Sequence, residues 1–301
     1  MGPIAYASRV SEELAAWAET IPGLRLGPRL GAGAFGTVFA AEHPEHGRVA
    51  LKVLPLGASV DEASFAAVAA LAHPNLLRLF AHGVHLGRPY VVMERVDGVE
   101  LLPSLRPPRP PVDSSRVRAT IPLAFGQQVQ EGGVSAFLPI RTDGLARLWP
   151  ALAQLASALA TLHRAGKVHR DVRPENVLIT PAGRVVLVDY GLLTDVERGD
   201  ESAEIAGAPA YMAPDDEPSP ASDWYSFGVL LFEALTGALP FAGTAQEVIV
   251  RKRTVIAPSP SFVVDLPPEA APLDALCVKL LRRARTMRAG VDEVMHALGA
   301  V

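Results

Sequence analysis

The sequence predicts an α+β fold in which strands come first and helices dominate the rest. Alternating apolar and polar residues predict strands at 49–53 and 89–94, and a glycine-rich stretch, 30–39, is typical of a tight turn between two strands. Leucines at helical spacing predict a long helix over 145–164, and the chain from 223 onward is mainly helical in character. With 301 residues, the chain is long enough for one two-lobed domain or two small ones.

Composition and charge limit the classes of function. Hydrophobic residues make up 49% and charged residues 20% of the chain, as in a globular protein. The net charge of −4 favours neither nucleic acid nor a membrane surface as a partner, so we expect neither. Cys277 is the single cysteine, which excludes an internal disulfide and fits a reducing compartment. Residues 1–6 lack the pattern of a secretion signal, and we expect a cytoplasmic protein.

A short helix is predicted near the amino terminus, over residues 8–20. Val10, Leu14 and Trp17 share one face of it. We expect this apolar face to pack on the outside of the domain, with binding of a partner as the alternative.

Two features in the first third of the chain fit phosphate binding. Gly31, Gly33 and Gly36 would let backbone amides approach phosphate oxygens, although glycines in a plain hairpin turn give the same pattern. Lys52 follows on a predicted strand and is either a phosphate ligand or a solvated surface residue. Only four of the 28 basic residues are lysine, which favours the first interpretation of Lys52.

Two later segments bring together residues with catalytic chemistry. Asp171 and Asn176 are five positions apart in a stretch that Pro174 keeps from being helical. Asp189 directly follows a buried strand predicted at 185–188. These three side chains are a candidate base and two candidate metal ligands at the mouth of a cleft.

The stretch from His169 to Asn176 and the one from Asp189 to Gly191 resemble the catalytic and metal-binding loops of the eukaryotic-like (Hanks-type) serine/threonine protein kinases. Residues 207–215 and 223–229 resemble later motifs of that family, and the resemblance extends from about Leu26 to Leu298. The frequent use of Ala, Arg and Pro suggests a bacterial source.

The resemblance implies a particular domain organisation. An amino-terminal helical extension, 1–24, would precede a small antiparallel-sheet lobe with one helix, 25–96, and a larger, mainly helical lobe, 97–301. Residues 103–144 would be an insertion, with a polyproline run and a possible hairpin. Surface decoration and a docking or regulatory element are both open for it.

The resemblance also implies roles for individual residues. Asp171 would orient or deprotonate the acceptor hydroxyl, Asn176 and Asp189 would hold Mg²⁺ or Mn²⁺, and Lys52 and Arg173 would place positive charge near the phosphates of ATP. Met93 would be the gatekeeper, with backbone groups of Glu94 and Val96 at the adenine edge. The implied ATP site comprises Leu30, Gly31, Gly33, Gly36, Val38, Ala50, Lys52, Met93, Glu94, Val96 and Leu178.

Several positions depart from the family pattern. Ser64 stands where the family has a helix glutamate that pairs with the strand lysine, and Glu62 is either the replacement for it or a helix cap with Ser59. Ala208 replaces a threonine, and Asp215 replaces a glutamate expected to pair with Arg288. We expect an ATP-dependent kinase acting on serine or threonine of a protein substrate. The alternative is a pseudokinase that serves as a nucleotide-binding or docking scaffold.

Overall fold

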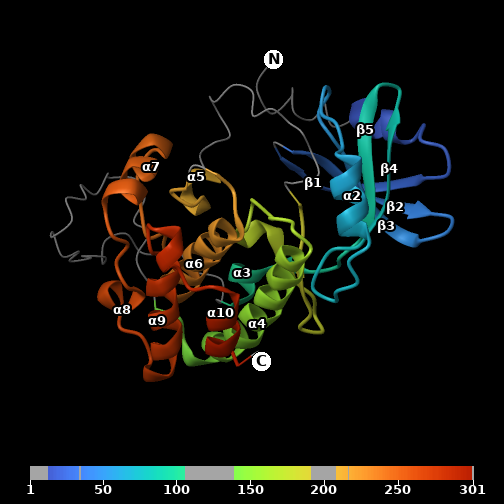
Figure 1. Ribbon diagram of the computed structural model, residues 1–301. Coiled ribbons are helices and arrows are strands. Elements are labelled where there is room, and N and C mark those ends of the chain that lie inside the picture. The colour runs from blue at the N-terminus through green and yellow to red at the C-terminus, as the bar shows by residue number, and fades with distance from the viewer. Residues whose placement is uncertain (1–12, 34, 106–138, 191–207, 216, 300–301) are drawn as a thin grey trace, which may run out of the picture.

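The computed structural model describes residues 13–33, 35–105, 139–190, 208–215 and 217–299. It has two lobes, a sheet lobe and a helical lobe, as predicted (Figure 1). The sheet is antiparallel with the strand order β1-β2-β3-β5-β4, and a small sheet, β6-β7-β8, belongs to the helical lobe. The strands are β1 Arg25–Gly33, β2 Gly36–His43, β3 Gly47–Val53, β4 Leu79–His85, β5 Arg88–Glu94, β6 Val99–Glu100, β7 Val177–Ile179 and β8 Val185–Leu187. The α-helices are α2 Glu62–Ala69, α3 Leu101–Leu105, α4 Thr142–Arg164, α5 Ala208–Tyr211, α6 Pro220–Thr236, α7 Ala245–Thr254, α8 Pro260–Val263, α9 Ala271–Leu280 and α10 Val291–Ala297, with short 3₁₀ turns at Pro174–Asn176, Pro268–Ala270 and Arg285–Met287.

One face of the five-stranded sheet is covered by the chain that precedes it. Successive strand residues point to opposite faces, so Phe39, Val49 and Leu51 share the back face, where they are buried. The helical segment 13–18 packs there, and the Trp17 indole N–H donates to the carbonyl of His85 at 3.2 Å. The predicted external packing of this helix is confirmed for its described part, whereas Val10 lies outside the described residues.

The front face of the sheet meets α2 and the helical lobe. Phe65 and Val68 of α2 are buried in the same hydrophobic core as the leucines of α4. The carboxylate of Asp61 caps α2 by accepting from the amides of Ala63 and Ser64 at 3.1 and 3.2 Å. The interpretation of Ser59 and Glu62 as a capping box is therefore wrong, because the helix starts at Glu62 and Asp61 already occupies the N-cap.

Helices α4 and α6 form the centre of the helical lobe. By length and composition α4 would suffice to cross a membrane, but Leu148, Leu152 and Leu155 on it are fully buried in the core. Its predicted span, 145–164, is confirmed, with three additional residues at the start. Helix α9 lies close against α6, since a Cβ atom on Gly228 would come within 2.7 Å of the Leu280 Cβ atom.

Both ends of the expected insertion are helical. Helix α3 ends at Leu105 and α4 begins at Thr142, so parts of the range 103–144 belong to the lobe itself. The Arg147 guanidinium donates to the carbonyl of Ser104 at 2.9 Å and joins these two flanks. The polyproline run and nearly all of the possible hairpin lie in 106–138, outside the described residues.

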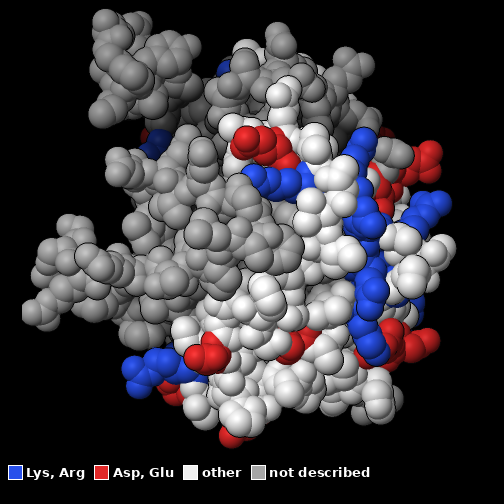
Figure 2. Space-filling model, turned by 90° about the vertical axis from the view of Figure 1, so that its left-hand side faces the viewer, with Lys and Arg blue, Asp and Glu red and all other residues white. Residues whose placement is uncertain are grey.

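The side of the molecule that carries α7 and α8 is unevenly charged. Figure 2 shows a row of Lys and Arg side chains on it, beside a broad area without charged side chains. Val250 of α7 and Phe262 of α8 are among the exposed apolar residues of this region.

Candidate active site

Asp223 of α6 holds the loop that carries Asp171 through hydrogen bonds to the backbone just before it. The Asp223 carboxylate, 1% exposed, accepts from the amides of His169 and Arg170 at 2.7 and 2.9 Å. It also contacts the Nε2 atom of His163 at 2.8 Å. Arg170 has a φ of 71°, a left-handed conformation that is unfavourable outside glycine, and the bond to Asp223 holds it there. A buried carboxylate therefore fixes the backbone immediately before Asp171.

Three of the predicted catalytic-loop residues come together. The Asn176 amide donates to the Asp171 carboxylate at 2.8 Å and to the Asp171 carbonyl at 2.9 Å. The 3₁₀ turn Pro174–Asn176 brings Asn176 back toward Asp171. Arg173 lies with its Nε atom 3.5 Å from the Asp171 carboxylate. This arrangement sets the orientation of the Asp171 carboxylate and leaves the Asn176 amide oxygen as a possible metal ligand.

Lys52 and Asp189 form an ion pair between the two lobes. Lys52 comes from β3 of the sheet lobe and Asp189 follows β8 of the helical lobe. Asp189 has a φ of 61°, again in the left-handed region, at the point where it turns its carboxylate toward the lysine. The pair therefore brings the predicted phosphate ligand and the predicted metal ligand to one place.

The donor atoms fit a magnesium or manganese ion. Asp189 and Asn176 offer hard oxygen ligands, which these ions prefer. Within the described ranges, no group of three or more His, Cys, Asp or Glu side chains could hold a metal ion alone. Mg²⁺ in nucleotide sites commonly binds one or two carboxylates and takes further oxygens from phosphates, so two protein ligands are sufficient here.

The register of the sheet places several of the predicted ATP-binding residues on its front face. Val38 lies opposite Lys52, and Ala50 lies opposite Met93, so all four share that face. Leu178 is on β7 in the other sheet. Gly36 has a φ of 123°, and a Cβ atom there would come within 2.2 Å of the Val53 carbonyl oxygen, so only glycine fits. Leu30, Gly31 and Gly33 lie on β1, ahead of this turn.

Glu94 has a structural role that the sequence did not reveal. Its carboxylate accepts two hydrogen bonds from the Arg184 guanidinium, at 2.6 and 3.1 Å, and its amide donates to the Arg78 carbonyl at 2.8 Å. The pairing raises the pKa of Arg184. Because the two side chains lie 90 residues apart in the sequence, no local pattern could have predicted the contact.

A family model described as protein tyrosine and serine/threonine kinase matches residues 24–263. The chain belongs to the protein kinase family. Over 238 residues it is 34% identical to the serine/threonine-protein kinase PknL of Mycobacterium tuberculosis, which covers 73% of this chain and 51% of the relative. Over 128 residues it is 40% identical to PknA of the same species, covering 40% of this chain and 30% of the relative. The chain thus spans about half or less of the length of these curated relatives.

The solved structures support the same fold. The kinase domain of PknI from M. tuberculosis, crystallised with one cysteine replaced by alanine, has a TM-score of 0.62 with this protein at 24% sequence identity. The match covers 93% of this chain and 96% of that one. The predicted identity as a bacterial kinase domain and the predicted two-lobed fold are both confirmed.

The kinase domain lacks the expected link between its sheet-lobe helix and Lys52. Glu62 is exposed, and Lys52 pairs with Asp189 instead. Ser64, at the position of the family's glutamate, is buried and accepts a hydrogen bond from the Lys167 Nζ atom at 2.9 Å. Its hydroxyl donates to Asp61 at 2.6 Å. Helix α2 is therefore tied to the segment before the catalytic loop rather than to the phosphate-binding lysine.

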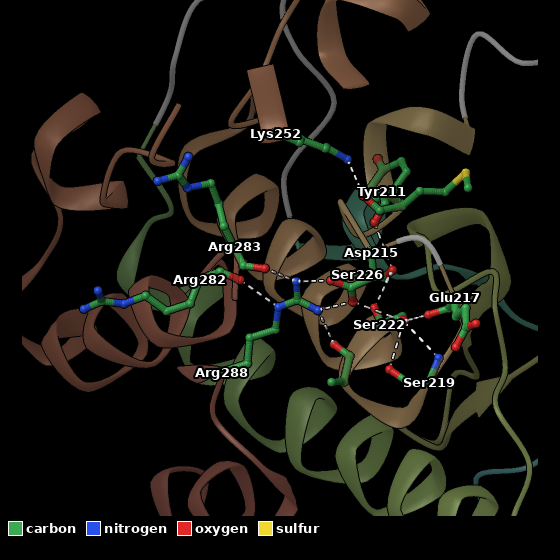
Figure 3. A network of polar contacts seen from close by, with 12 residues as sticks. Tyr211, Asp215, Glu217, Ser219, Ser222, Ser226, Lys252, Arg282, Arg283 and Arg288 are labelled. Carbon is green, nitrogen blue, oxygen red and sulfur yellow. Dashed lines mark hydrogen bonds and ion pairs between the residues drawn. The ribbon is translucent and has the colours of Figure 1, made fainter. Parts of the chain in front are cut away.

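The predicted pairing of Asp215 with Arg288 is confirmed. The Arg288 guanidinium donates to both oxygens of Asp215, at 2.5 and 2.7 Å, and also to the carbonyls of Arg282 and Arg283, at 2.7 Å each (Figure 3). Its charge lies 4.9 Å from the centre of the Tyr225 ring. The shorter Asp215 side chain therefore still reaches the arginine. The side chain of Ala208 is outside the described residues.

Proposed function

We propose that this kinase domain transfers the γ-phosphate of ATP to a serine or threonine hydroxyl of a protein. The observation that carries the proposal is that the Asp171–Asn176 pair and the Asp189–Lys52 pair lie side by side, since the amide of Val188 donates to the Asn176 carbonyl at 2.9 Å. Phosphoryl transfer needs a positioned hydroxyl and positive charge on the phosphates more than covalent chemistry, and these four side chains supply both.

Each side chain has a specific task in the proposed reaction. Asp171 accepts a hydrogen bond from the acceptor hydroxyl and takes its proton as the hydroxyl oxygen bonds to the γ-phosphorus and the bond from that phosphorus to the leaving ADP breaks. Asn176 holds the Asp171 carboxylate in place for this step. Lys52 exchanges its contact with Asp189 for the phosphates of ATP, and Arg173 keeps a planar positive charge beside Asp171. A magnesium or manganese ion held by Asp189 and Asn176 would neutralise charge on the phosphates.

Two further points support the choice of substrate and compartment. The curated relatives are named serine/threonine-protein kinases, and the stretch Arg173–Asn176 is of the type found in that class. We extend this to a serine or threonine acceptor in a protein substrate. We propose a cytoplasmic location because the sequence has a single cysteine, Cys277, which fits a reducing compartment. Its thiol is free and buried, and burial raises its pKa, which keeps it unreactive.

The test is transfer of labelled γ-phosphate, with Mg²⁺ or Mn²⁺, to the protein itself and to a basic peptide containing serine and threonine. We expect transfer by the wild type and its loss in Lys52→Ala and Asp171→Ala. Lys279→Ala is the matched control, since Lys279 on α9 is exposed and pairs with Glu293 of α10 rather than with any residue of the candidate site. Absence of transfer by the wild type, while ATP still raises its melting temperature, would overturn the proposal in favour of a nucleotide-binding pseudokinase.

A further inference from the structure

Lys252 is a buried lysine whose contacts the active site described above does not use. It lies on α7 and is 2% exposed. Its Nζ atom donates to the carbonyls of Pro209, Ala210 and Met212 at 2.6, 2.6 and 2.7 Å. Figure 3 shows the Lys252 side chain pointing with its nitrogen toward Tyr211 and the backbone beside it. All three hydrogens of the ammonium are thus directed at one short stretch of backbone.

Burying the ammonium of Lys252 has a cost that its hydrogen bonds must offset. The three acceptors are uncharged carbonyls, so no carboxylate among them compensates the buried charge. Burial lowers the pKa of Lys252 to about 7, which expresses the cost of desolvating the ammonium. A cation–π contact with the Tyr225 ring, whose centre lies 5.5 Å from the Lys252 Nζ atom, offsets part of that cost. An apolar side chain would avoid this cost but would leave the carbonyls of residues 209–212 without their donor, so what the buried ammonium supplies is the set of hydrogen bonds to this stretch.

The stretch that Lys252 holds lies beside the catalytic loop. The Ser226 hydroxyl donates to the Tyr211 carbonyl at 2.9 Å, and the Tyr211 hydroxyl donates to Glu233 at 2.5 Å, so α6 supports the stretch from one side. Burial raises the pKa of Tyr211. The charges of two catalytic-loop residues also affect this pKa, since Glu175 raises it and Arg173 lowers it, so that loop lies within electrostatic reach of Tyr211. A peptide that brings its hydroxyl to Asp171 would come close to this stretch, because Arg173 lies beside Asp171 and within electrostatic reach of Tyr211.

We propose that Lys252 is a positioning residue for the protein substrate, which fixes residues 209–212 so that a peptide lying against them presents its hydroxyl to Asp171. The inference rests on the proposed kinase function and adds a residue that acts on the protein substrate and not on ATP. Helix α7 would then support the peptide site from behind, because Lys252 reaches from it to the backbone of α5.

The test compares steady-state kinetics of Lys252→Met, Lys279→Met and the wild type with a serine-containing peptide that the wild type phosphorylates. Methionine keeps the length of the buried stem and removes the charge and the donors. We expect the KM for the peptide to rise about tenfold or more, as a misplaced binding segment implies, and the KM for ATP to stay within about twofold. Lys279→Met, which changes an exposed lysine, should match the wild type for both substrates.

Hydrogen exchange at the amides of residues 208–215 gives a second readout that needs no catalysis. We expect faster exchange there in Lys252→Met, with unchanged exchange in α4. Equal changes in the two KM values, or an unchanged peptide KM, would overturn the inference. A wild type without any transfer would refute the proposed function instead, and unchanged exchange at 208–215 would then also refute the holding role of Lys252.

Discussion

Removing the carboxylate of Asp223 should loosen the catalytic loop before it unfolds the protein. In Asp223→Ala the amides of His169 and Arg170 lose their acceptor, and the His169 amide is buried while the Arg170 amide is partly buried. A buried amide without a partner costs about 1 to 3 kcal/mol, and the partly buried amide adds less, so we expect a loss of about 2 to 4 kcal/mol in the free energy of unfolding. Arg170 would also be freed from its left-handed conformation, so the loop would relax and move Asp171.

Asp223→Asn separates the effect on stability from the effect on phosphate transfer. The asparagine keeps one acceptor oxygen and the volume of the side chain, so we expect a smaller loss of stability, about 1 to 3 kcal/mol. Phosphate transfer should nevertheless fall about a hundredfold, because a shift of about 1 Å in the catalytic loop has an effect of that order. The assays are urea unfolding for stability and initial rates of transfer at saturating ATP.

A matched control is available on α9. Asp274 also accepts from a backbone amide, that of Ser261 at 2.9 Å, but on the surface of the molecule. Asp274→Asn should change stability by less than about 1 kcal/mol and leave transfer unaffected. If Asp223→Asn were as stable and as active as the Asp274→Asn control, Asp223 would not be the group that holds the loop.

Three further changes test separate contacts. Arg288→Met should lower the free energy of unfolding by about 3 kcal/mol in urea titrations, because it leaves the largely buried Asp215 carboxylate without a compensating positive charge. Lys252→Met should alter the pH dependence of stability. Between pH 7 and the usual lysine value of 10.5 the unfolded wild type holds one more proton than the folded one, so its stability relative to Lys252→Met should rise with pH, by up to about 1.4 kcal/mol per unit. Lys167→Met should remove the bond to Ser64, cost about 1 kcal/mol and accelerate hydrogen exchange in α2.

Each of these expectations has an outcome that contradicts it. An Arg288→Met protein as stable as the wild type would show that Asp215 finds water or another donor. A stability difference independent of pH for Lys252→Met would mean that the lysine keeps its proton in the fold. Unchanged exchange in Lys167→Met would mean that the Asp61 cap and the packing of Phe65 and Val68 fix α2 without this bond.

Local spacing predicted the parts of the site that local geometry creates. Asp171 and Asn176 meet because they are five residues apart on a turn that includes Pro174, and all of this is visible in the sequence. The long helix α4 followed from the spacing of its leucines, whose burial the structure confirms. Where a short segment determines the arrangement, sequence reasoning was sufficient.

Contacts between distant segments could not be predicted in this way. Asp223 lies 54 residues from His169, and its position at the start of an apolar helix suggested no partner. The same holds for Lys252, because its acceptors are backbone carbonyls, which every residue type has and which the sequence therefore cannot reveal. The prediction of where α2 starts was wrong for another reason. Ser59 and Asp61 are both residue types that cap helices well, and only the folded backbone decides between them.

The cover on the back face of the sheet bears on how this domain should be expressed. A fragment trimmed to residues 24–263, the span of the family match, would lose the segment around Trp17 and would expose Phe39, Val49 and Leu51 to water. Contiguous apolar surface of that kind promotes self-association. The same trimming would remove Arg288 and leave Asp215 uncompensated. The fragment that keeps these contacts is therefore longer than the span of the family match, and fragments for crystallisation or inhibitor screening should keep both flanks.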